Sequence, residues 1–458
     1  MKSIPLTDLL NQSLAALPAG VAEQGIAIAY SGGLDSSALL HALHASGKHN
    51  PHAFHIHHGL SPNADAWQAH CAAECARLGI SYAARKVSLQ ADGKGTEASA
   101  RKARYAALGS LCKEHGVSLL LTAHHQDDQA ETVLLQLLRG AGPAGLSGMD
   151  AFNHAPELLQ NETLLLARPL LQASRAQLEA YVREHAIAHI EDESNSDPRY
   201  ARNALRHGVM PLLAASFPGF QERFARSASH AQSAQRLLTE LAEADLQAIL
   251  QGDSIDLTAL AALSKDRRAN VLRHWFAVRQ IRIPSAAWLA EMQDQALTAR
   301  EDANLKVSHP DCEVRRHRGR LHLAPKLREL EGTREDQFDD KPGQHFRWSG
   351  EASMPFPAYG GTLHFDKAEE GLDPAWLRDQ LLTIEFRRGG ERLKPAHNRP
   401  TRNLKHHYQA LGVPAWERER SPVVSIPGQV LFAAGIGMDC HKMTLGTGDR
   451  IVFRWQAE

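Results

Sequence analysis

The stretch that decides the fold is Ile26-Ala-Ile-Ala-Tyr30, followed directly by Ser31-Gly-Gly-Leu-Asp-Ser36 and the apolar run Ser37-Ala-Leu-Leu40. This order predicts a short buried strand, a glycine–serine loop and a helix. Two adjacent glycines let successive backbone N–H groups point into one concavity, and the start of the following helix adds partial positive charge. The loop therefore predicts a phosphate site, with Asp35 at its edge.

The loop differs from a Walker A sequence because no lysine follows its glycines. Without a lysine to follow the β- and γ-phosphates, the site suits an enzyme that holds pyrophosphate as a leaving group. In such an enzyme a nucleophile of the substrate attacks the α-phosphate of ATP. ATP is therefore the expected ligand.

Short apolar runs alternate with helical patterns from about residue 25 to residue 170. The runs are Ile26–Tyr30, Phe54–His57, Tyr82–Val87, Val117–Thr122 and Leu164–Ala167. This alternation is typical of βαβ units. It predicts an α/β fold with a doubly wound parallel sheet, and ligands bound beyond the carboxyl ends of its strands.

The remaining chain predicts further domains. Pro218-Gly219 marks a boundary, and Phe220–Gln251 and Leu257–Leu297 have helical patterns. The last segment mixes one helix with strand-like runs, so a small α+β domain is expected. The strand-like runs are Thr383–Arg387, Pro422–Ile426, Val430–Ala434 and Ile451–Trp455. We thus expect an α/β catalytic domain over 1–217, a helical substrate-binding domain over 218–325, a connector over 326–380 and the α+β domain over 381–458.

Composition limits the compartment and the partners. The net charge is -1, so any nucleic-acid surface must be local. The five cysteines are scattered and form no CxxC pair, which argues against a disulfide framework, a structural zinc site or an iron–sulfur cluster. No apolar run approaches the length of a membrane span. We expect a cytoplasmic protein without a membrane partner.

A second polar cluster follows the predicted strand Val117–Thr122. It contains His124, His125, Asp127, Asp128 and Glu131. On a helix the three carboxylates share a face near its start, and their number exceeds what the helix dipole needs. They suit Mg²⁺ or an ammonium group such as that of lysine, while a histidine moves a proton. Zinc is the weaker alternative, because no third soft ligand lies nearby.

Two helices carry arginines that suit anions. The first places Glu97, Arg101 and Arg104 on adjacent turns, although a solvated ion-pair face explains this spacing equally well. The second begins after Asp197-Pro198. Its Arg199, Arg202 and Arg206 share one face, which can hold phosphates of ATP or RNA or clamp to Asp192.

Positive charge is concentrated near the carboxyl terminus. Between Leu381 and Arg420, nine Lys or Arg residues oppose four acidic residues. This excess predicts a surface for the phosphates of a nucleic acid, with a solvated basic face as the alternative. Trp416 suits either a base stack or a core position. The predicted RNA-binding residues are Arg387, Arg388, Arg392, Lys394, Arg402, Lys405 and Arg418.

Together these motifs resemble the tRNA(Ile)-lysidine synthetase family of PP-loop, or N-type ATP pyrophosphatase, enzymes. The resemblance covers nearly the whole chain except about Glu329–Glu370. It is carried by SGGLDSSALL, His57-His58-Gly59-Leu60, Glu97–Tyr105, HHQDDQAET, Arg139–Leu146, the segment DESNSDPRYARNALRH, Arg267–Trp275, Val314–Leu321, Arg387–Lys405 and Leu411–Pro422.

The resemblance implies a ligase that uses ATP to adenylate the C2 carbonyl oxygen of the wobble cytidine in tRNA(Ile) with a CAU anticodon. The ε-amine of free L-lysine then displaces AMP and gives lysidine. Codon reading and amino-acid identity change from methionine to isoleucine. The implied cofactors are ATP and Mg²⁺, and a homodimer is compatible with the sequence.

The resemblance also implies roles for the residues. Those implied to bind ATP are Ser31, Gly32, Gly33, Leu34, Asp35 and Ser36, with Asp35 positioning Mg²⁺. Those implied to be catalytic are Asp35, His124, His125, Asp127, Asp128 and Glu131. Those implied to bind lysine or phosphate are Arg101, Arg104, Arg202 and Arg206.

Two rival functions fit parts of the sequence. A PP-loop tRNA thiolase also adenylates a cytidine, but it generally needs paired cysteines, and Cys71 and Cys75 are one residue too far apart for CxxC. A non-catalytic nucleotide- or RNA-binding module would not need both Asp35 and the histidine–carboxylate cluster. Both features favour an enzyme.

Overall fold

The computed structural model describes residues 4–57, 59, 61–87, 96–191, 201–300, 305–326 and 343–457. The motif residues His58 and Leu60, the segment 192–200 with Asp192 and Arg199, and the side chain of Glu97 lie outside the described residues. The chain divides into two compact units, Met1–Ala244 and Asp245–Glu458, which are described separately.

The first unit is built on a six-stranded sheet with the order β3-β2-β1-β4-β6-β5. The strands are β1 (Ile26–Ala29), β2 (His52–His57), β3 (Ser81–Lys86), β4 (Leu119–Leu121), β5 (Phe152–His154) and β6 (Leu165–Ala167). All neighbours are parallel except β5, which is antiparallel to β6. The predicted parallel sheet is confirmed, and β5 was not predicted.

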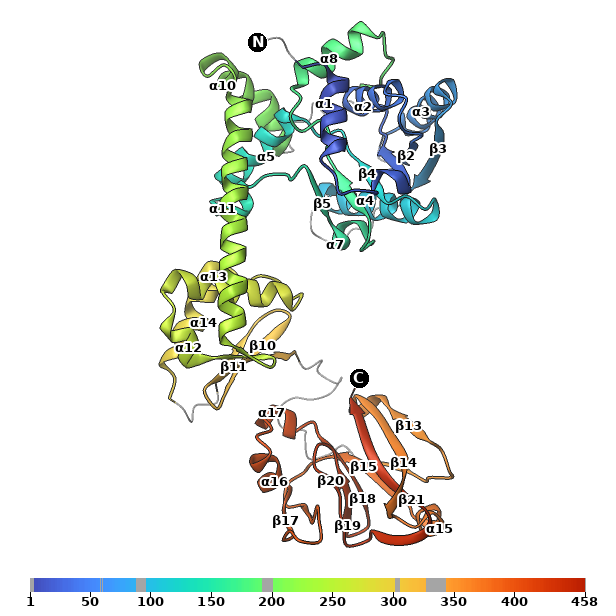
Figure 1. The fold of residues 1–458 in the computed structure, drawn as a ribbon, viewed down its shortest axis with the longest axis vertical. Coiled ribbons are helices and arrows are strands. Elements are labelled where there is room, and N and C mark those ends of the chain that lie inside the picture. Colours follow the sequence, from blue (N-terminus) through green and yellow to red (C-terminus); the bar gives the residue numbers. More distant parts are fainter. Residues whose placement is uncertain are drawn as a thin grey trace. The chain divides into compact units, whose positions relative to one another are not determined.

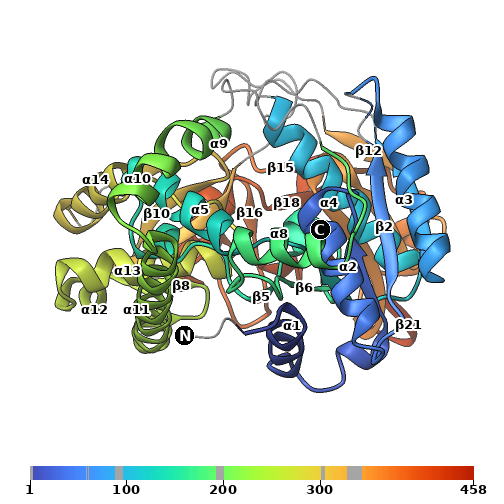
Figure 2. The same ribbon diagram turned by 90° about the horizontal axis from the view of Figure 1, so that it is seen from above.

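Helices cover both faces of this sheet (Figure 1), and Figure 2 shows β2 between α3 and α4. Because successive strand residues point to opposite faces, Ile28 packs in one hydrophobic cluster and Ala27 in the other. The Ile28 cluster includes α1 (Leu6–Ala15), α2 (Leu34–Ala45), α3 (Ala64–Leu78) and α8 (Arg175–Glu184). The Ala27 cluster includes α4 (Thr96–Glu114) and α7 (Pro156–Leu159). Burial on both faces explains why the central strands β1, β4 and β6 are wholly apolar, whereas β2, β3 and β5 carry polar residues.

A helical segment follows the sheet. Buried Ala130, Met210 and Phe220 form a small core that joins α5 (Gln126–Leu138) to α10 (Met210–Ser216) and to the start of α11 (Phe220–Ile249). The short elements of this unit are the 3₁₀ turn Ala22–Gln24, α6 (Pro143–Leu146), α9 (Ala201–Ala204) and the π-helical turn Leu205–Val209. The start of α11 is thereby fixed to the helix that carries the predicted carboxylates.

The first part of the second unit is mixed rather than helical. Its helices α12 (Leu257–Ala262), α13 (Lys265–Val278) and α14 (Ala286–Thr298) follow the prediction. They pack on a five-stranded antiparallel sheet in the order β7-β8-β11-β10-β9, which the sequence did not predict. The strands are β7 (Leu250–Gln251), β8 (Ser254–Asp256), β9 (Lys306–Ser308), β10 (Cys312–His317) and β11 (Arg320–Pro325). They are short and rich in charge, so alternation is weak.

The last part of the unit is α+β, as predicted. One sheet has the order β12-β15-β18-β19-β20, a second β13-β14-β21, and a third pairs β16 with β17. The elements are β12 (Gln344–Phe346), β13 (Ser353–Phe356), the 3₁₀ turn Pro357–Tyr359, β14 (Gly361–Gly371), α15 (Pro374–Asp379), β15 (Leu382–Phe386), β16 (Arg392–Leu393), β17 (Arg402–Asn403), α16 (Leu404–Ala410), α17 (Ala415–Arg418), β18 (Pro422–Ile426), β19 (Gln429–Ala433), β20 (Gly437–Met438) and β21 (Thr444–Ala457).

Residues 343–380 differ from the connector that the sequence predicted. Phe346 and Leu363 pack in one core with Leu382 and Phe453. This part of the predicted connector thus shares the core of the carboxyl-terminal fold. Within the described residues, no helix combines the length and the apolar character that crossing a membrane requires.

Candidate active site

The loop between β1 and α2 is folded by its own serines. The Oγ atoms of Ser31 and Ser36 lie 3.0 Å apart, and the N–H of Ser31 donates to Ser36 Oγ at 3.3 Å. Ser36 Oγ also lies 3.0 Å from the Gly33 carbonyl. Gly33 caps α2, so the N–H groups of Leu34, Asp35 and Ser36 have no carbonyl partner within the helix. These N–H groups are the donors that the predicted anion nest would use.

Gly32 is required by its conformation and its surroundings. Its φ is +83°, and a Cβ placed there would lie 2.6 Å from Ile190 Cδ1 and 2.7 Å from Cys71 Sγ. The N–H of Ile190 donates to the Gly32 carbonyl at 2.8 Å. The loop is therefore held by the backbone of Ile190, and the side chains of Ile190 and Cys71 occupy the space that a Cβ at Gly32 would need.

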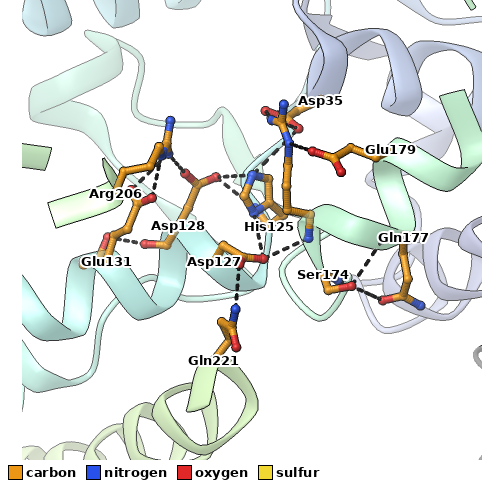
Figure 3. Close-up of polar contacts among 12 residues, drawn as sticks. Asp35, His125, Asp127, Asp128, Glu131, Ser174, Gln177, Glu179, Arg206 and Gln221 are labelled. Carbon is orange, nitrogen blue, oxygen red and sulfur yellow. Dashed lines mark hydrogen bonds and ion pairs between the residues drawn. The ribbon is translucent and has the colours of Figure 1, made fainter. Parts of the chain in front are cut away.

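His125 lies among the carboxylates that the sequence placed together (Figure 3). It precedes α5, and Asp128 caps that helix by accepting from the His125 N–H at 3.1 Å. The His125 ring lies 3.7 Å from Asp35, 3.7 Å from Asp127 and 3.5 Å from Asp128. Because β1 and β4 are adjacent and parallel, the residues that follow them meet at one edge of the sheet.

Arginines neutralise two of the three carboxylates of α5. Arg206 donates to Glu131 at 2.7 Å and to Asp128 at 3.0 Å, and Arg202 lies 3.4 Å from Glu131. Asp127 differs, because it accepts from the Gln221 side chain at 3.1 Å and from the Arg175 backbone at 2.8 Å. The cluster is thus a paired network in which, of these three carboxylates, Asp127 alone accepts hydrogen bonds only from neutral donors.

Two members of this network were not predicted. Arg175 Nη1 lies 2.6 and 2.7 Å from the two oxygens of Asp35. Gln221 joins from the start of α11. Arg175 begins α8 directly after the capping residue Ser174, and such a position gave no functional signal in the sequence.

The two adjacent histidines belong to different groups. His124 Nδ1 lies 2.9 Å from Thr122 Oγ1, and although Asp128 is near enough to influence it, His124 forms no ion pair with a carboxylate of the described residues. Burial lowers the pKa of His124 to about 3; Asp128 opposes this, while Arg168, Arg101 and Arg104 lower the pKa further, so the ring is neutral at physiological pH. The guanidinium carbons of Arg101 and Arg104 lie 5.0 and 5.4 Å from the Tyr105 ring. These arginines form a cationic group beside His124.

Burial and pairing shift the carboxylates in different directions. Burial raises the pKa of Asp35, although His125 and Arg175 oppose this. Burial also raises the pKa of Glu131 despite its pairing with Arg206. For Asp128, burial is outweighed by His125, His124 and Arg206, which hold its pKa below the ordinary value. Asp128 therefore stays ionised at neutral pH.

The residues fit Mg²⁺ only in part. No group of three or more His, Cys, Asp or Glu side chains within the described part of the chain is arranged to hold a metal ion. Mg²⁺ usually takes one or two carboxylates and completes its shell with phosphate oxygens and water, which suits Asp35 beside the phosphate loop. Arg175 holds both Asp35 oxygens in the structure, so it competes with a cation. Zinc gains no support, because His124 and His125 belong to separate groups.

The carboxyl-terminal basic residues are only partly brought together. A shallow pocket of about 480 Å³ is lined by Arg392, Thr401, Arg402, Asn403 and His406. Lys405 is exposed beside it on α16.

Four other predicted RNA-binding residues do not line this pocket: Arg387, Arg388, Lys394 and Arg418. Arg418 donates to the Val413 carbonyl at 2.6 Å, and Arg388 pairs with Glu385 at 2.9 Å. Trp416 is half-buried, and its ring lies 5.9 Å from that of His317 and 5.6 Å from that of His322, so part of it is used in packing.

Three family models match successive parts of this chain. A PP-loop domain model matches residues 6–213, a TilS substrate binding domain model 255–322, and a TilS substrate C-terminal domain model 382–455. A tRNA(Ile)-lysidine synthase of Burkholderia pseudomallei (strain K96243) is 43% identical over 94% of this chain and 92% of its own length. The chain belongs to the tRNA(Ile)-lysidine synthase family.

Other members of the lysidine synthase family match as fully. The enzyme of that name from Ralstonia nicotianae (strain ATCC BAA-1114 / GMI1000) is 42% identical over 97% of this chain and 96% of its own length. That from Nitrosomonas europaea (strain ATCC 19718 / CIP 103999 / KCTC 2705 / NBRC 14298) is 34% identical over 99% and 97%. The resemblance inferred from the motifs is confirmed. The PP-loop match includes every residue labelled in Figure 3 except Gln221.

Proposed function

We propose that this protein uses ATP to join free L-lysine to C2 of the wobble cytidine of tRNA(Ile) with a CAU anticodon. The products are lysidine, AMP and diphosphate. The observation that carries the proposal is the meeting of an anion nest and a histidine–carboxylate network at Asp35, at one edge of a parallel sheet. Membership of the lysidine synthase family supports it.

In the first step, the C2 oxygen of cytidine attacks the α-phosphate and diphosphate leaves. The first-turn N–H groups of α2 and the Ser31 and Ser36 hydroxyls are suited to hold that leaving group. When bound, Mg²⁺ would neutralise charge on diphosphate beside Asp35. The preformed loop means that the donors need little reorganisation when charge develops.

In the second step, the ε-amine of lysine attacks C2 and AMP leaves with the C2 oxygen. The ammonium form must lose a proton first. Asp127 suits the attraction of that ammonium because neutral groups donate its hydrogen bonds, and the His125 ring 3.7 Å away is placed to take the proton. Asp128 and Glu131 then act mainly by positioning, since Arg206 pairs with both.

The cationic group beside His124, formed by Arg101 and Arg104, suits an anionic group of a substrate. Arg104 is half-buried, and burial lowers its pKa although Tyr105 opposes this. A buried cation favours an anion as partner. We assign Arg101 and Arg104 to the carboxylate of lysine or to a phosphate of ATP.

The thiolase alternative is not favoured. All five cysteines are free and buried. Burial raises the pKa of Cys71 to about 12 and that of Cys75 to about 12, which opposes thiolate formation. Sulfur transfer would need a reactive thiolate or a cluster at one of them.

The direct test is incorporation of radiolabelled lysine into a tRNA(Ile) transcript with a CAU anticodon, in the presence of ATP and Mg²⁺. Label should enter this RNA and not a transcript with a GAU anticodon, with one AMP formed for each lysine. If lysine is inert while sulfide is incorporated, the thiolase function is correct. If ATP and RNA bind but no AMP forms with any acceptor, the protein is a binding module.

Asp35→Ala should abolish AMP and diphosphate formation, with a loss of at least a hundredfold in rate, because the nest loses its only side-chain carboxylate. Glu157→Ala, at an exposed position on α7, is the control and should leave the rate unchanged. Both rates are measured by release of labelled diphosphate. A D35A variant that retains its melting temperature and a normal rate would remove Asp35 from the mechanism.

A further inference from the structure

Arg175 is fixed by its backbone to the catalytic helix. Ser174 caps α8, since its Oγ accepts from the Gln177 N–H at 3.3 Å and its own N–H donates to the Gln177 side chain at 2.9 Å. The N–H of Arg175 then donates to Asp127 at 2.8 Å. The point from which the guanidinium projects is therefore set relative to α5.

The guanidinium leaves two donors for a further acceptor. Nη1 contacts both oxygens of Asp35, and Nε lies 3.1 Å from Glu179. No hydrogen bond of Nη2 occurs with any described residue. Arginine carries five N–H donors in a planar fork, so Nη2 can bind an acceptor while Nη1 is still paired. The side chain is 39% exposed, so the acceptor can come from solution.

An ion pair that merely joins α2 to α8 would also explain the contact with Asp35. These helices are already joined by buried Leu39 and Leu178, and an ion pair with a partly exposed arginine adds little to such a core. The pair also lies at the first turn of α2, where three backbone N–H groups form the anion nest. A guanidinium beside N–H donors that have no carbonyl partner within the helix favours a phosphate group as the shared ligand.

We propose that Arg175 is a positioning residue that exchanges Asp35 for the polyphosphate of ATP. With no nucleotide bound, Arg175 neutralises Asp35. When ATP arrives, the guanidinium transfers to the phosphate oxygens, and the Asp35 carboxylate becomes free for the cation that accompanies the nucleotide. This inference rests on the proposed use of ATP but not on the identity of the acceptor, so it is tested without RNA or lysine.

The probe is inorganic pyrophosphate, with binding measured by calorimetry in EDTA and in Mg²⁺. Arg175→Ala should raise the Kd for pyrophosphate at least tenfold, and Arg175→Lys, which keeps the charge but loses the fork, should have a smaller effect. Adenosine affinity should not change. Arg183→Ala, an exposed arginine on the same helix, is the matched control and should bind pyrophosphate normally.

A double-mutant cycle separates exchange from a structural tie. Asp35→Asn removes the competitor for Arg175, so pyrophosphate in EDTA should bind several-fold more tightly than to the parent protein. This gain in affinity should be smaller in the R175A background, where the only remaining effect of D35N is to remove the repulsion between the Asp35 carboxylate and pyrophosphate. Melting temperatures check that each variant folds. Unchanged pyrophosphate affinity in R175A or R175K, or an equal gain from D35N in both backgrounds, would overturn the proposal.

Discussion

Adjacent residues of similar chemistry do different work at this site. Gly32 has a left-handed φ and no space for a Cβ, whereas Gly33 has a φ of -70° and its nearest neighbour would be Ser31 Oγ at 3.5 Å. His125 sits among carboxylates while His124 lies beside arginines. The sequence predicted each pair as a unit, because spacing alone does not show which way a side chain turns.

The glycines give a test at the scale of one residue. Gly32→Ala should lower the free energy of unfolding of the amino-terminal unit by about 2–4 kcal/mol, the combined cost of backbone strain and overpacking. It should also abolish pyrophosphate binding, because the loop must move away from Ile190. Gly33→Ala should be close to neutral for stability. Urea unfolding and calorimetry measure both effects, and equal behaviour of the two variants would contradict the steric argument.

At the scale of elements, the site was predictable where its signals are local. The loop after β1 and the cluster at the start of α5 each follow a strand within a few residues, so strand, motif and helix could be seen together. The pairing of Arg175 with Asp35 joins residues 140 positions apart, and that of Arg206 with Glu131 joins residues 75 apart. Such pairings depend on how α8 and the turn after α9 pack.

The packing of α2 on α3 gives a test through pH. Glu74 on α3 lies 2.7 Å from His41 on α2 and accepts two hydrogen bonds from Arg77. The Arg77 guanidinium lowers the pKa of Glu74 to about 2, from an ordinary value of 4.5. A carboxylate whose pKa is lower in the folded than in the unfolded protein stabilises the fold at pH values above the unfolded-state pKa. This stabilisation by Glu74 is lost as the pH falls from 4.5 towards 2.

Glu74→Gln should therefore lower the free energy of unfolding by about 2 kcal/mol at pH 7, the typical value for hydrogen bonds to a charged group. The difference from the parent protein should narrow as the pH falls below 4.5. Pulsed hydrogen exchange of α3 along urea titrations measures this difference in the free energy of unfolding. Glu157→Gln on α7 is the control. A difference that stays constant from pH 7 to pH 3 would show that charge is not its origin.

At the scale of the whole molecule, fold class was predictable where burial imposes a pattern. Strands covered on both faces are continuous apolar runs, which is why β1 and β4 were seen. The sheet of the middle segment was missed because β10 contains Arg315, Arg316 and His317 and buries only part of its length. In the same way, the apolar pattern of β14 is interrupted by Asp366 and Lys367. This strand joins its core by pairing with β21, which is distant in the sequence.

The pocket beside α16 provides the test of how the molecule grips RNA. Charge reversal at Arg402 and Lys405 should raise the Kd for tRNA(Ile) by 10- to 100-fold at moderate salt, because roughly two phosphate contacts are lost. The slope of log Kd against log salt should fall by about 1–2 for the same reason. The rate of lysine incorporation at saturating tRNA should be preserved, since the site at Asp35 lies in the other compact unit.

Arg347→Glu makes the same kind of charge change at an exposed position outside this pocket and should alter neither the Kd nor the salt slope. Filter binding at several salt concentrations measures both. An unchanged Kd in the R402E/K405E variant would show that Arg402 and Lys405 form a solvated basic face and do not contact RNA. The remaining predicted arginines would then be tested in the same way.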